Sequence, residues 1–372
     1  MIRNKKQKNL RFFGRTFLLI NIVFATLLLI SYLASVTNPS TFWPLAFLGL
    51  GYPFILLVNV FFIIYWLFRK PKLALISLII VLLGTNTILN YIGFRETTAI
   101  EVPKSSGNFL RIMTYNVHFF KPFNQKNDIA TRDQILNIIR KEQPDVICFQ
   151  EYFTRKKGDY NFNKLLKEVL RSKYAYFKED DTNDYESYGM AIFSKFPIVH
   201  SEEIPFKNTY TGNEAIYSDI KYKDTLVRIY NVHFQSINFQ PEDYKYLKEV
   251  RKIDPDVKSS RRIGSRLKSA FIKRAEQVKL IKDHSTNCKM PFVVAGDFND
   301  TPISYAVATM SAGLNNAFRL KGSGLGVTYN GDFPNFQIDY ILTSKDFDVK
   351  NYLIVKKKLS DHYAVRSDLE LK

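Results

Sequence analysis

The stretch Pro291-Phe292-Val293-Val294-Ala295-Gly296-Asp297-Phe298-Asn299 decides the fold of this 372-residue chain. Its apolar first half is typical of a short buried strand, and the residues from Gly296 onward mark where that strand ends. At such an end Asp297 and Asn299 can converge on one bound group, because they lie two positions apart on an extended chain. Asp and Asn are also common turn formers. The stretch alone therefore leaves a plain turn and a metal-assisted phosphate site both open.

Further polar residues share this placement within or at the end of an apolar run. Taken singly, each has an ordinary explanation as a strand cap, a turn, a paired acid or a buried histidine. Their common placement favours a single site on the rim of a sheet core, since independent accidents would rarely agree. These residues are Asn116, Glu151, His233, Asp339 and the pair Asp361-His362.

The sequence around these residues predicts an α/β domain with many strands. Short β-branched or aromatic runs alternate with helical patterns, and we find no internal repeat. Helices are expected at residues 132–141, 162–170 and 267–284, the last with a clear apolar stripe. Strands are expected at residues 110–117, 146–149, 190–193, 216–221, 226–234, 292–295, 337–342 and 363–369.

The first quarter of the chain differs from the rest in composition. Its apolar stretches at residues 12–36, 42–68 and 73–94 are each long enough to cross about 30 Å of hydrocarbon as a helix. A cleaved secretion signal is disfavoured, because its apolar core is shorter than the first stretch and two more stretches follow. We therefore expect three transmembrane helices within residues 1–95, a linker at 96–107 and a catalytic domain at 108–372.

The distribution of cations predicts how the chain sits in the bilayer. Lys and Arg cluster before residue 16 and at residues 69–72, whereas residues 37–41 carry no charge. By the positive-inside rule the N-terminus is cytoplasmic. With three spans, the domain after residue 94 then faces the periplasm or the cell exterior.

The net charge is basic throughout the chain. Of the formal +18, residues 1–96 contribute 10 Lys/Arg and 1 Asp/Glu, and the remainder contributes 43 and 34. A basic soluble part favours polyanions or an anionic bilayer as partners. Residues 245–274 hold 11 Lys/Arg against 3 Asp/Glu and are interpreted as a mobile surface insertion. That insertion is either a solvated loop or an arm that attracts the phosphates of nucleic acid or lipid.

In chain order, the segments that hold the polar residues resemble the motif series of the endonuclease/exonuclease/phosphatase superfamily. The resemblance covers about residues 108 to 372 and implies a four-layer sandwich of two mixed β-sheets flanked by helices. It implies hydrolysis of phosphoric esters, with nucleic acid or phospholipid/sugar phosphate as substrate. The matching segments are Thr114-Tyr115-Asn116-Val117, Gln150-Glu151, Tyr188-Gly189-Met190-Ala191-Ile192-Phe193-Ser194, Asn231-Val232-His233, Gly296-Asp297-Phe298-Asn299-Asp300-Thr301-Pro302, Ile338-Asp339-Tyr340-Ile341-Leu342 and Ser360-Asp361-His362.

The resemblance also implies a metal site. By matching position, Asn116 and Glu151 would hold a divalent cation, with Asp361 close to it. Carboxylate and amide oxygens suit Mg²⁺, and Mn²⁺ is the alternative.

The remaining matched residues would act on the substrate. Asp297 would activate the attacking water, and Asn299 would hold a phosphate oxygen. His362, oriented by Asp339, would stabilise the developing charge, and His233 would contact the phosphate or the leaving oxygen. A carboxylate beside an imidazole fixes its tautomer and favours its cationic form.

Two departures from the family pattern weaken the case for DNA. Asn213-Glu214 stand where pancreatic-type nucleases have an arginine, and Gln337 stands where many relatives have a basic residue. A different class of function is a catalytically silent, membrane-anchored binding or scaffold module of the same fold. That alternative is disfavoured, because a silent relative is expected to lose at least one of the matched Glu, Asp, Asn or His positions.

Overall fold

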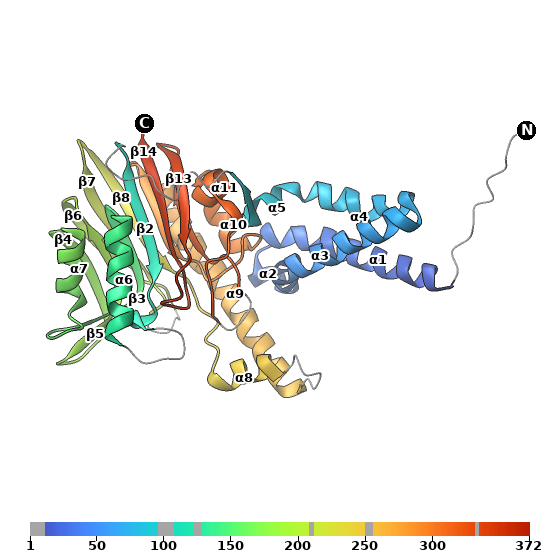
Figure 1. Cartoon of the computed structure of the whole chain (residues 1–372), viewed down its shortest axis with the longest axis horizontal. Coiled ribbons are helices and arrows are strands. Elements are labelled where there is room, and N and C mark those ends of the chain that lie inside the picture. The colour runs from blue at the N-terminus through green and yellow to red at the C-terminus, as the bar shows by residue number, and fades with distance from the viewer. Residues whose placement is uncertain (1–11, 96–107, 122–127, 208–211, 250–255, 332–334) are drawn as a thin grey trace, which may run out of the picture.

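The computed structural model describes residues 12–95, 108–121, 128–207, 212–249, 256–331 and 335–372. Two six-stranded sheets face each other in the C-terminal part, and a bundle of N-terminal helices projects from one side of them (Figure 1). The linker expected at residues 96–107 lies outside the described residues.

The first sheet is mixed. Strands β2 and β3 run parallel, whereas the other neighbours are antiparallel. Every residue of β2 is buried, because both faces of this central strand are covered. The strand order is β13 (Phe347–Val355), β14 (Ala364–Leu371), β2 (Leu110–Asn116), β3 (Val146–Arg155), β5 (Glu186–Ser194) and β4 (Tyr174–Thr182).

The second sheet repeats this design. Its parallel pair is β8 and β9, and all other neighbours are antiparallel. The order is β10 (Asn315–Asn316), β12 (Asp339–Thr343), β9 (Phe292–Asp297), β8 (Thr225–His233), β7 (Ala215–Tyr222) and β6 (Ile198–Ile204).

Apolar side chains fill three layers. One cluster, which includes Ile112 and Ile229, lies between the sheets. On the outer face of the first sheet, helices α6 (Ile129–Glu142) and α7 (Phe162–Leu170) contribute Ile135 and Leu166. On the other outer face, α9 (Val257–Thr286) and α10 (Tyr305–Ser311) cover the second sheet. The expectation of two mixed sheets flanked by helices is confirmed.

Apart from Asp256, the described residues of the basic segment at residues 245–274 are helical, so the segment is not a loop there. Helix α8 (Pro241–Glu249) includes its first residues, and α9 begins ten residues before the apolar stripe that predicted it. The Asp256 carboxylate caps α9 by accepting from the backbone N–H groups of Lys258 and Ser259. Ile263 extends the buried stripe of α9 toward that cap.

Two N-terminal helices are long and apolar enough to cross a membrane. They are α1 (Phe12–Ser31), continued by the 3-10 turn η1 (Tyr32–Ser35), and α3 (Pro44–Arg69); the short helix α2 (Pro39–Phe42) lies between them. Buried polar side chains join the bundle: Asn21 donates to Ser77, Ser77 donates to Asn59, and Trp66 donates to Asn21. Such pairs bind helices together where water is scarce.

The third apolar stretch is not one straight helix, so the expected span at residues 73–94 is corrected. Helices α4 (Pro71–Leu83) and α5 (Thr85–Tyr91) meet at a bend of 64°, and only together are they long and apolar enough for a broken span or a re-entrant loop. The bend lies at Gly84, where a Cβ would approach the Tyr32 hydroxyl oxygen to 2.0 Å. Tyr32 occupies this space and donates to the Ile80 carbonyl at 3.0 Å. A side chain that inserts among the backbone hydrogen bonds of a helix is a recognised cause of a kink.

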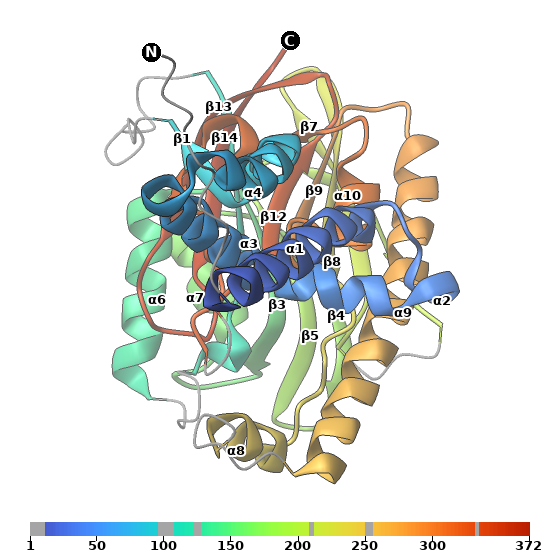
Figure 2. The same cartoon turned by 90° about the vertical axis from the view of Figure 1, so that its right-hand side faces the viewer.

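In Figure 2 helices α1, α3 and α4 lie in front of the sheets, and several contacts attach this bundle to them. Strand β1 (Ile92–Phe94), which follows α5, pairs with β11 (Ser323–Leu325) in antiparallel register. Arg319 of α11 (Ala317–Lys321) donates to the Asn86 carbonyl at 2.6 Å and to Asn90 Oδ1 at 2.7 Å. Ile303 packs into an apolar cluster with Leu28 and Tyr52. The position of the bundle relative to the sheets is therefore set by backbone pairing as well as by side-chain packing.

Candidate functional site

The matched polar residues meet at one edge of the sandwich. Asn116 ends β2, His233 ends β8 and Asp297 ends β9. His233 and Asp297 are register partners in the parallel pair of β8 and β9. Parallel strands end at the same edge, so consecutive strand ends bring these side chains together.

Glu151 reaches the site through a β-bulge. The register between β3 and β5 shifts between Phe149 and Tyr152, and Glu151 itself has a φ of 48°. A bulge re-aims the side chain it carries. Asn116 Nδ2 donates to Glu151 Oε1 at 3.2 Å and to Asp297 Oδ2 at 3.1 Å. The two carboxylates therefore face each other across one amide.

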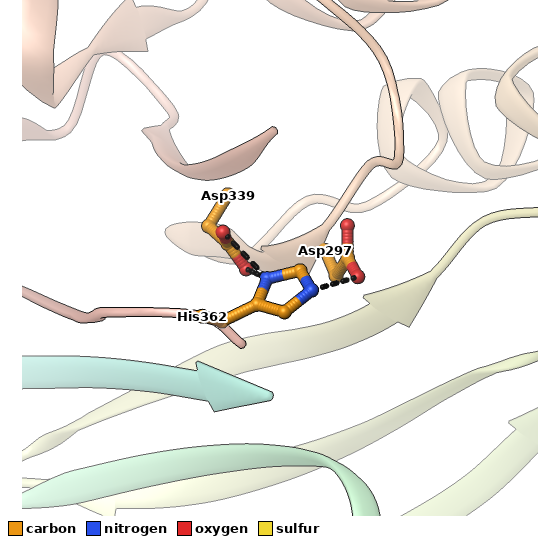
Figure 3. A group of neighbouring side chains, drawn as sticks. All are labelled: Asp297, Asp339 and His362. Atoms are coloured by element: carbon orange, nitrogen blue, oxygen red, sulfur yellow. Dashed lines mark hydrogen bonds and ion pairs between the residues drawn. The ribbon is translucent and has the colours of Figure 1, made fainter. Parts of the chain in front are cut away.

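The imidazole of His362 lies between two carboxylates (Figure 3). Its Nδ1 is 3.0 Å from Asp339 Oδ2, and its Nε2 is 3.6 Å from Asp297 Oδ2. Burial works to lower the pKa of His362, but the charges of Asp339 and Asp297 outweigh it and raise this pKa well above 6.5. The ring is therefore cationic at neutral pH.

These three residues bring ligand atoms within 4.8 Å of one another, a spacing that a metal ion could use. The hydrogen bond at Nδ1 occupies one nitrogen of the ring, and the ring separates the carboxylates of Asp297 and Asp339. We therefore interpret the group as a hydrogen-bonded acid–imidazole–acid chain.

Burial weakens the acidity of Asp297. It raises the pKa of this carboxyl from 3.8 to about 6; the charges of His362 and His233 oppose the shift, and the charge of Asp339 adds to it. Asn299, with a φ of 52°, donates its backbone N–H to Asp297 Oδ1 at 2.7 Å. The Asn299 side chain donates to the Phe234 carbonyl at 2.9 Å, so it also lies at the site. A carboxylate with a pKa near 6 suits a general base at neutral pH.

The pKa of Glu151 is shifted in the opposite direction to that of Asp297. Burial favours its neutral form, but the hydrogen bond from His118 and the charges of His233, His118 and His362 prevail and lower its pKa to about 2. His118 Nδ1 lies 3.2 Å from Glu151 Oε2 and 3.9 Å from Asp361 Oδ1. Glu151 is therefore ionised, and Asp361 approaches the same nitrogen of the His118 ring.

The residues expected at a metal site fit a divalent cation. The Glu151 and Asp361 carboxylates and the Asn116 amide are oxygen donors of the kind that Mg²⁺ and Mn²⁺ prefer. Beside them, His233 Nε2 is buried and has no hydrogen-bond partner among the described residues. This nitrogen lies 3.6 Å from Asp297 Oδ2 and 3.9 Å from Glu151 Oε1. A buried polar atom without a partner is costly, and here it points to a ligand bound between the carboxylates.

His118 was missed from the sequence, although a signal for it exists. The tetrapeptide Tyr115-Asn116-Val117-His118 recurs as Tyr230-Asn231-Val232-His233, at the ends of β2 and β8. These strands occupy matching positions beside the parallel partners β3 and β9, so the finding of no internal repeat is corrected. Asn231 does not join the site: it donates to the Phe149 carbonyl and accepts from Gln150, linking the two sheets.

The site opens into a cavity of about 300 Å³. Its polar lining includes Glu151, Asp297, Asn299, Asp361 and His362. The space is large enough for a phosphate group and part of the group that it esterifies.

Comparison with known proteins fits this geometry. Residues 113–362 match the model of the Endonuclease/Exonuclease/phosphatase family, which is more than half of the chain. The chain belongs to this family. A second model, of a domain of unknown function, matches residues 14–91, which include the two apolar helices.

Solved structures share the endonuclease/exonuclease/phosphatase fold with this chain. A family member from Beutenbergia cavernae aligns with a TM-score of 0.53 and 21% identity, over 71% of this chain and 72% of that one. A family member from Bacteroides vulgatus aligns with a TM-score of 0.52 and 18% identity, over 72% of this chain and 100% of the other. At these identities the likeness shows the fold alone. A comparison with curated proteins found no match.

Proposed function

We propose that this chain is a membrane-tethered, divalent-metal-dependent phosphoesterase that hydrolyses a phosphodiester or phosphomonoester by direct attack of water. One observation carries the proposal: the His362 imidazole is held between Asp339 and Asp297, next to the oxygen donors Asn116 and Glu151. Membership of the family supports the same reaction class.

Asn116, Glu151 and Asp361 would hold the cation. When bound, a divalent cation polarises a phosphoryl oxygen and offsets charge on the leaving group. Asp297 then accepts a proton from the attacking water, which its pKa of about 6 permits at neutral pH.

The two histidines act on the phosphate. Protonated His362 donates from Nε2 to the phosphoryl or leaving oxygen, while Asp339 holds Nδ1 and with it the orientation of the ring. His233 Nε2, which lacks a partner among the described residues, contacts the phosphate or the leaving oxygen. The donor on His362 stabilises negative charge as it develops.

The proposal also places the catalytic domain outside the cytoplasm. Helix α3 runs away from the sheets and α4 returns, so the connection with Arg69 and Lys70 lies at the far end of the bundle (Figure 1). By the positive-inside rule that end is cytoplasmic. The sheets then lie on the periplasmic or extracellular side, with α4 and α5 together acting as a broken third span.

The test uses the full chain in lipid nanodiscs. Hydrolysis of bis(p-nitrophenyl) phosphate and of p-nitrophenyl phosphate is measured before and after EDTA, and again after Mg²⁺ or Mn²⁺ is restored. We expect loss with the chelator and recovery with the metal. Asp297→Asn should abolish turnover, whereas Asp224→Asn, at an exposed turn, should not. Turnover that survives both EDTA and Asp297→Asn would overturn the proposal.

A further inference from the structure

The cavity that holds the catalytic side chains is also lined by apolar residues. Asp297 and His362 belong to the two sheets, whereas these apolar residues come largely from α3, α8 and α9. We define the apolar wall by six lining residues: Leu50, Phe239, Leu247, Ile263, Leu267 and Phe271. A phosphate at the catalytic end would therefore leave the rest of its molecule against hydrocarbon.

Ion pairs between α8 and α9 hold most of the apolar wall in place. Most of it comes from α8 and α9, which are held together by Asp243, a residue with 0% of its surface exposed. The Asp243 carboxylate lies 2.7 Å from Arg262 Nε and 3.2 Å from Arg266 Nε. These ion pairs hold α8 against α9, and Leu247, Ile263 and Leu267 from the two helices line the same cavity.

The apolar wall also reaches the membrane helices. Leu50 lies near the start of α3, which is apolar enough to cross a bilayer. Next to it, the rings of Phe47 and Phe271 meet edge to face at 5.3 Å. Lys268 Nζ lies 5.0 Å from the centroid of Trp43, which is 40% exposed. An exposed Trp beside a Lys at the end of a spanning helix is typical of the headgroup region.

The charge of the lining argues against nucleic acid. Among the described residues that line this cavity, Arg274 is the one Lys or Arg side chain, and it is buried and paired with Asp300 at 3.1 Å. Nucleic acid binding depends on several Lys or Arg contacts to successive phosphates. Two cations of the basic segment, Arg262 and Arg266, already pair with Asp243.

We propose that the substrate is a lipid phosphate ester, with its phosphate between Asp297 and His362 and a hydrocarbon chain along the apolar wall toward α3. This inference rests on the proposed phosphoesterase function and names its substrate class. The lipid would enter from the outer leaflet, since the wall continues into the helix that borders the bilayer. The cavity, which α3 helps to line, would thus connect the bilayer with the catalytic side chains for an amphiphilic substrate.

Chain length gives a direct test. Full-length protein in nanodiscs is titrated with methyl-, butyl-, hexyl- and octylphosphonate, which have no ester bond to hydrolyse, and binding is followed by calorimetry against empty nanodiscs. The Kd is expected to fall roughly fourfold for each added methylene until the wall is covered. The kcat/KM of the matching p-nitrophenyl alkyl phosphodiesters should rise in parallel.

Two variants of α9 distinguish an effect of the apolar wall from an effect of any Leu→Gln substitution on this helix. Leu267→Gln should flatten the dependence of Kd on chain length and leave methylphosphonate binding within about twofold. Leu280→Gln, on the same helix and 42% exposed outside the wall, should match the wild type. Leu247→Gln repeats the test from α8 if Leu267→Gln fails to fold.

The outcomes distinguish this inference from the proposed function. Hydrolysis with no chain-length dependence, or faster cleavage of single-stranded DNA or RNA than of any alkyl ester, would overturn the lipid substrate and leave the phosphoesterase standing. Chain-dependent binding without hydrolysis would overturn the phosphoesterase and leave the lipid site standing. If Kd depends on alkyl chain length in Leu267→Gln and Leu247→Gln as it does in the wild type, the hydrocarbon chain does not lie along the apolar wall.

Discussion

Asp339 Oδ2 lies 3.0 Å from His362 Nδ1. Asp339 begins β12 of the second sheet, whereas His362 lies just before β14 of the first sheet, so the pair forms only where the two sheets meet at the end of the sandwich. The opposite nitrogen of the ring faces Asp297 at 3.6 Å. This pairing sets both the orientation and the charge of the imidazole. A substitution of Asp339 can therefore change the pKa of His362 while the imidazole itself stays in place.

Asp339→Asn should lower kcat by about 100-fold or more on a p-nitrophenyl phosphate ester. Removal of this charge lowers the pKa of His362 and allows the ring to turn, so the cationic donor is lost near neutral pH. Steady-state kinetics of the variant, with thermal unfolding as the folding control, measures the effect. Full activity in a folded variant would contradict the role of Asp339.

Asp297→Asn should abolish turnover and raise the thermal midpoint at pH 7. The folded-state pKa of Asp297, about 6, lies above the unfolded value of 3.8, so the folded state binds this proton more tightly. The charged side chain therefore lowers stability as the pH rises from about 4 to above 6, and a neutral amide escapes that penalty. Kinetics and calorimetry on one preparation test both effects. A lower midpoint together with lost activity would indicate misfolding instead.

The pH profile of kcat/KM should be bell-shaped. Asp297 must be unprotonated, so the rate should fall as the pH drops through about 6. His362 must be protonated, so the rate should fall again on the alkaline side, well above pH 6.5. Asp339→Asn should move the alkaline limb to lower pH, since the charge that raises the pKa of His362 is gone. An acidic limb near 4, as for an exposed carboxyl, would argue against Asp297 as the base.

Glu151→Gln should raise the Mg²⁺ concentration for half-maximal activity by about 10- to 100-fold. The change removes an ionised oxygen ligand and leaves the shape of the side chain almost unchanged. Glu276→Gln, at an exposed position of α9, is the matched control and should leave the metal requirement as it is. Equal Mg²⁺ dependence in both variants would remove Glu151 from the metal site.

Two glycine variants should have opposite effects on stability. Gly296 has a φ of 151°, and a Cβ there would lie 2.0 Å from the Val232 carbonyl oxygen, so Gly296→Ala should push β9 away from β8 and from His233. A Cβ at Gly264 in α9 meets nothing within 4 Å, so Gly264→Ala should stabilise the chain by about 1 kcal/mol. Chemical denaturation of the two variants measures the difference. A Gly296→Ala variant as stable as the wild type would contradict the close strand approach.

Local patterns were enough to predict much of the fold and to select, apart from His118, the polar residues that meet at the candidate site. Buried runs such as residues 292–295 are apolar because both of their faces are covered, so they stand out in the sequence. More exposed strands were missed: β4 and β6 carry charged residues on open faces and give no apolar run. The helical start of α9 was missed as well, since its high charge hid the apolar positions that face the sheet.

The sequence by itself determined that acid, amide and imidazole side chains stand at strand ends, because a buried strand is an apolar run and its end is visible as a change to polar residues. Only the tertiary structure decided how they combine. The bulge that turns Glu151, the approach of His118 and the placement of His362 between two acids depend on contacts between distant segments. The same is true of the apolar wall, where Leu50 of α3 and Leu267 of α9 line one cavity. Residues more than 200 positions apart become neighbours only when the two sheets and the helical bundle pack together, and no local pattern records that distance.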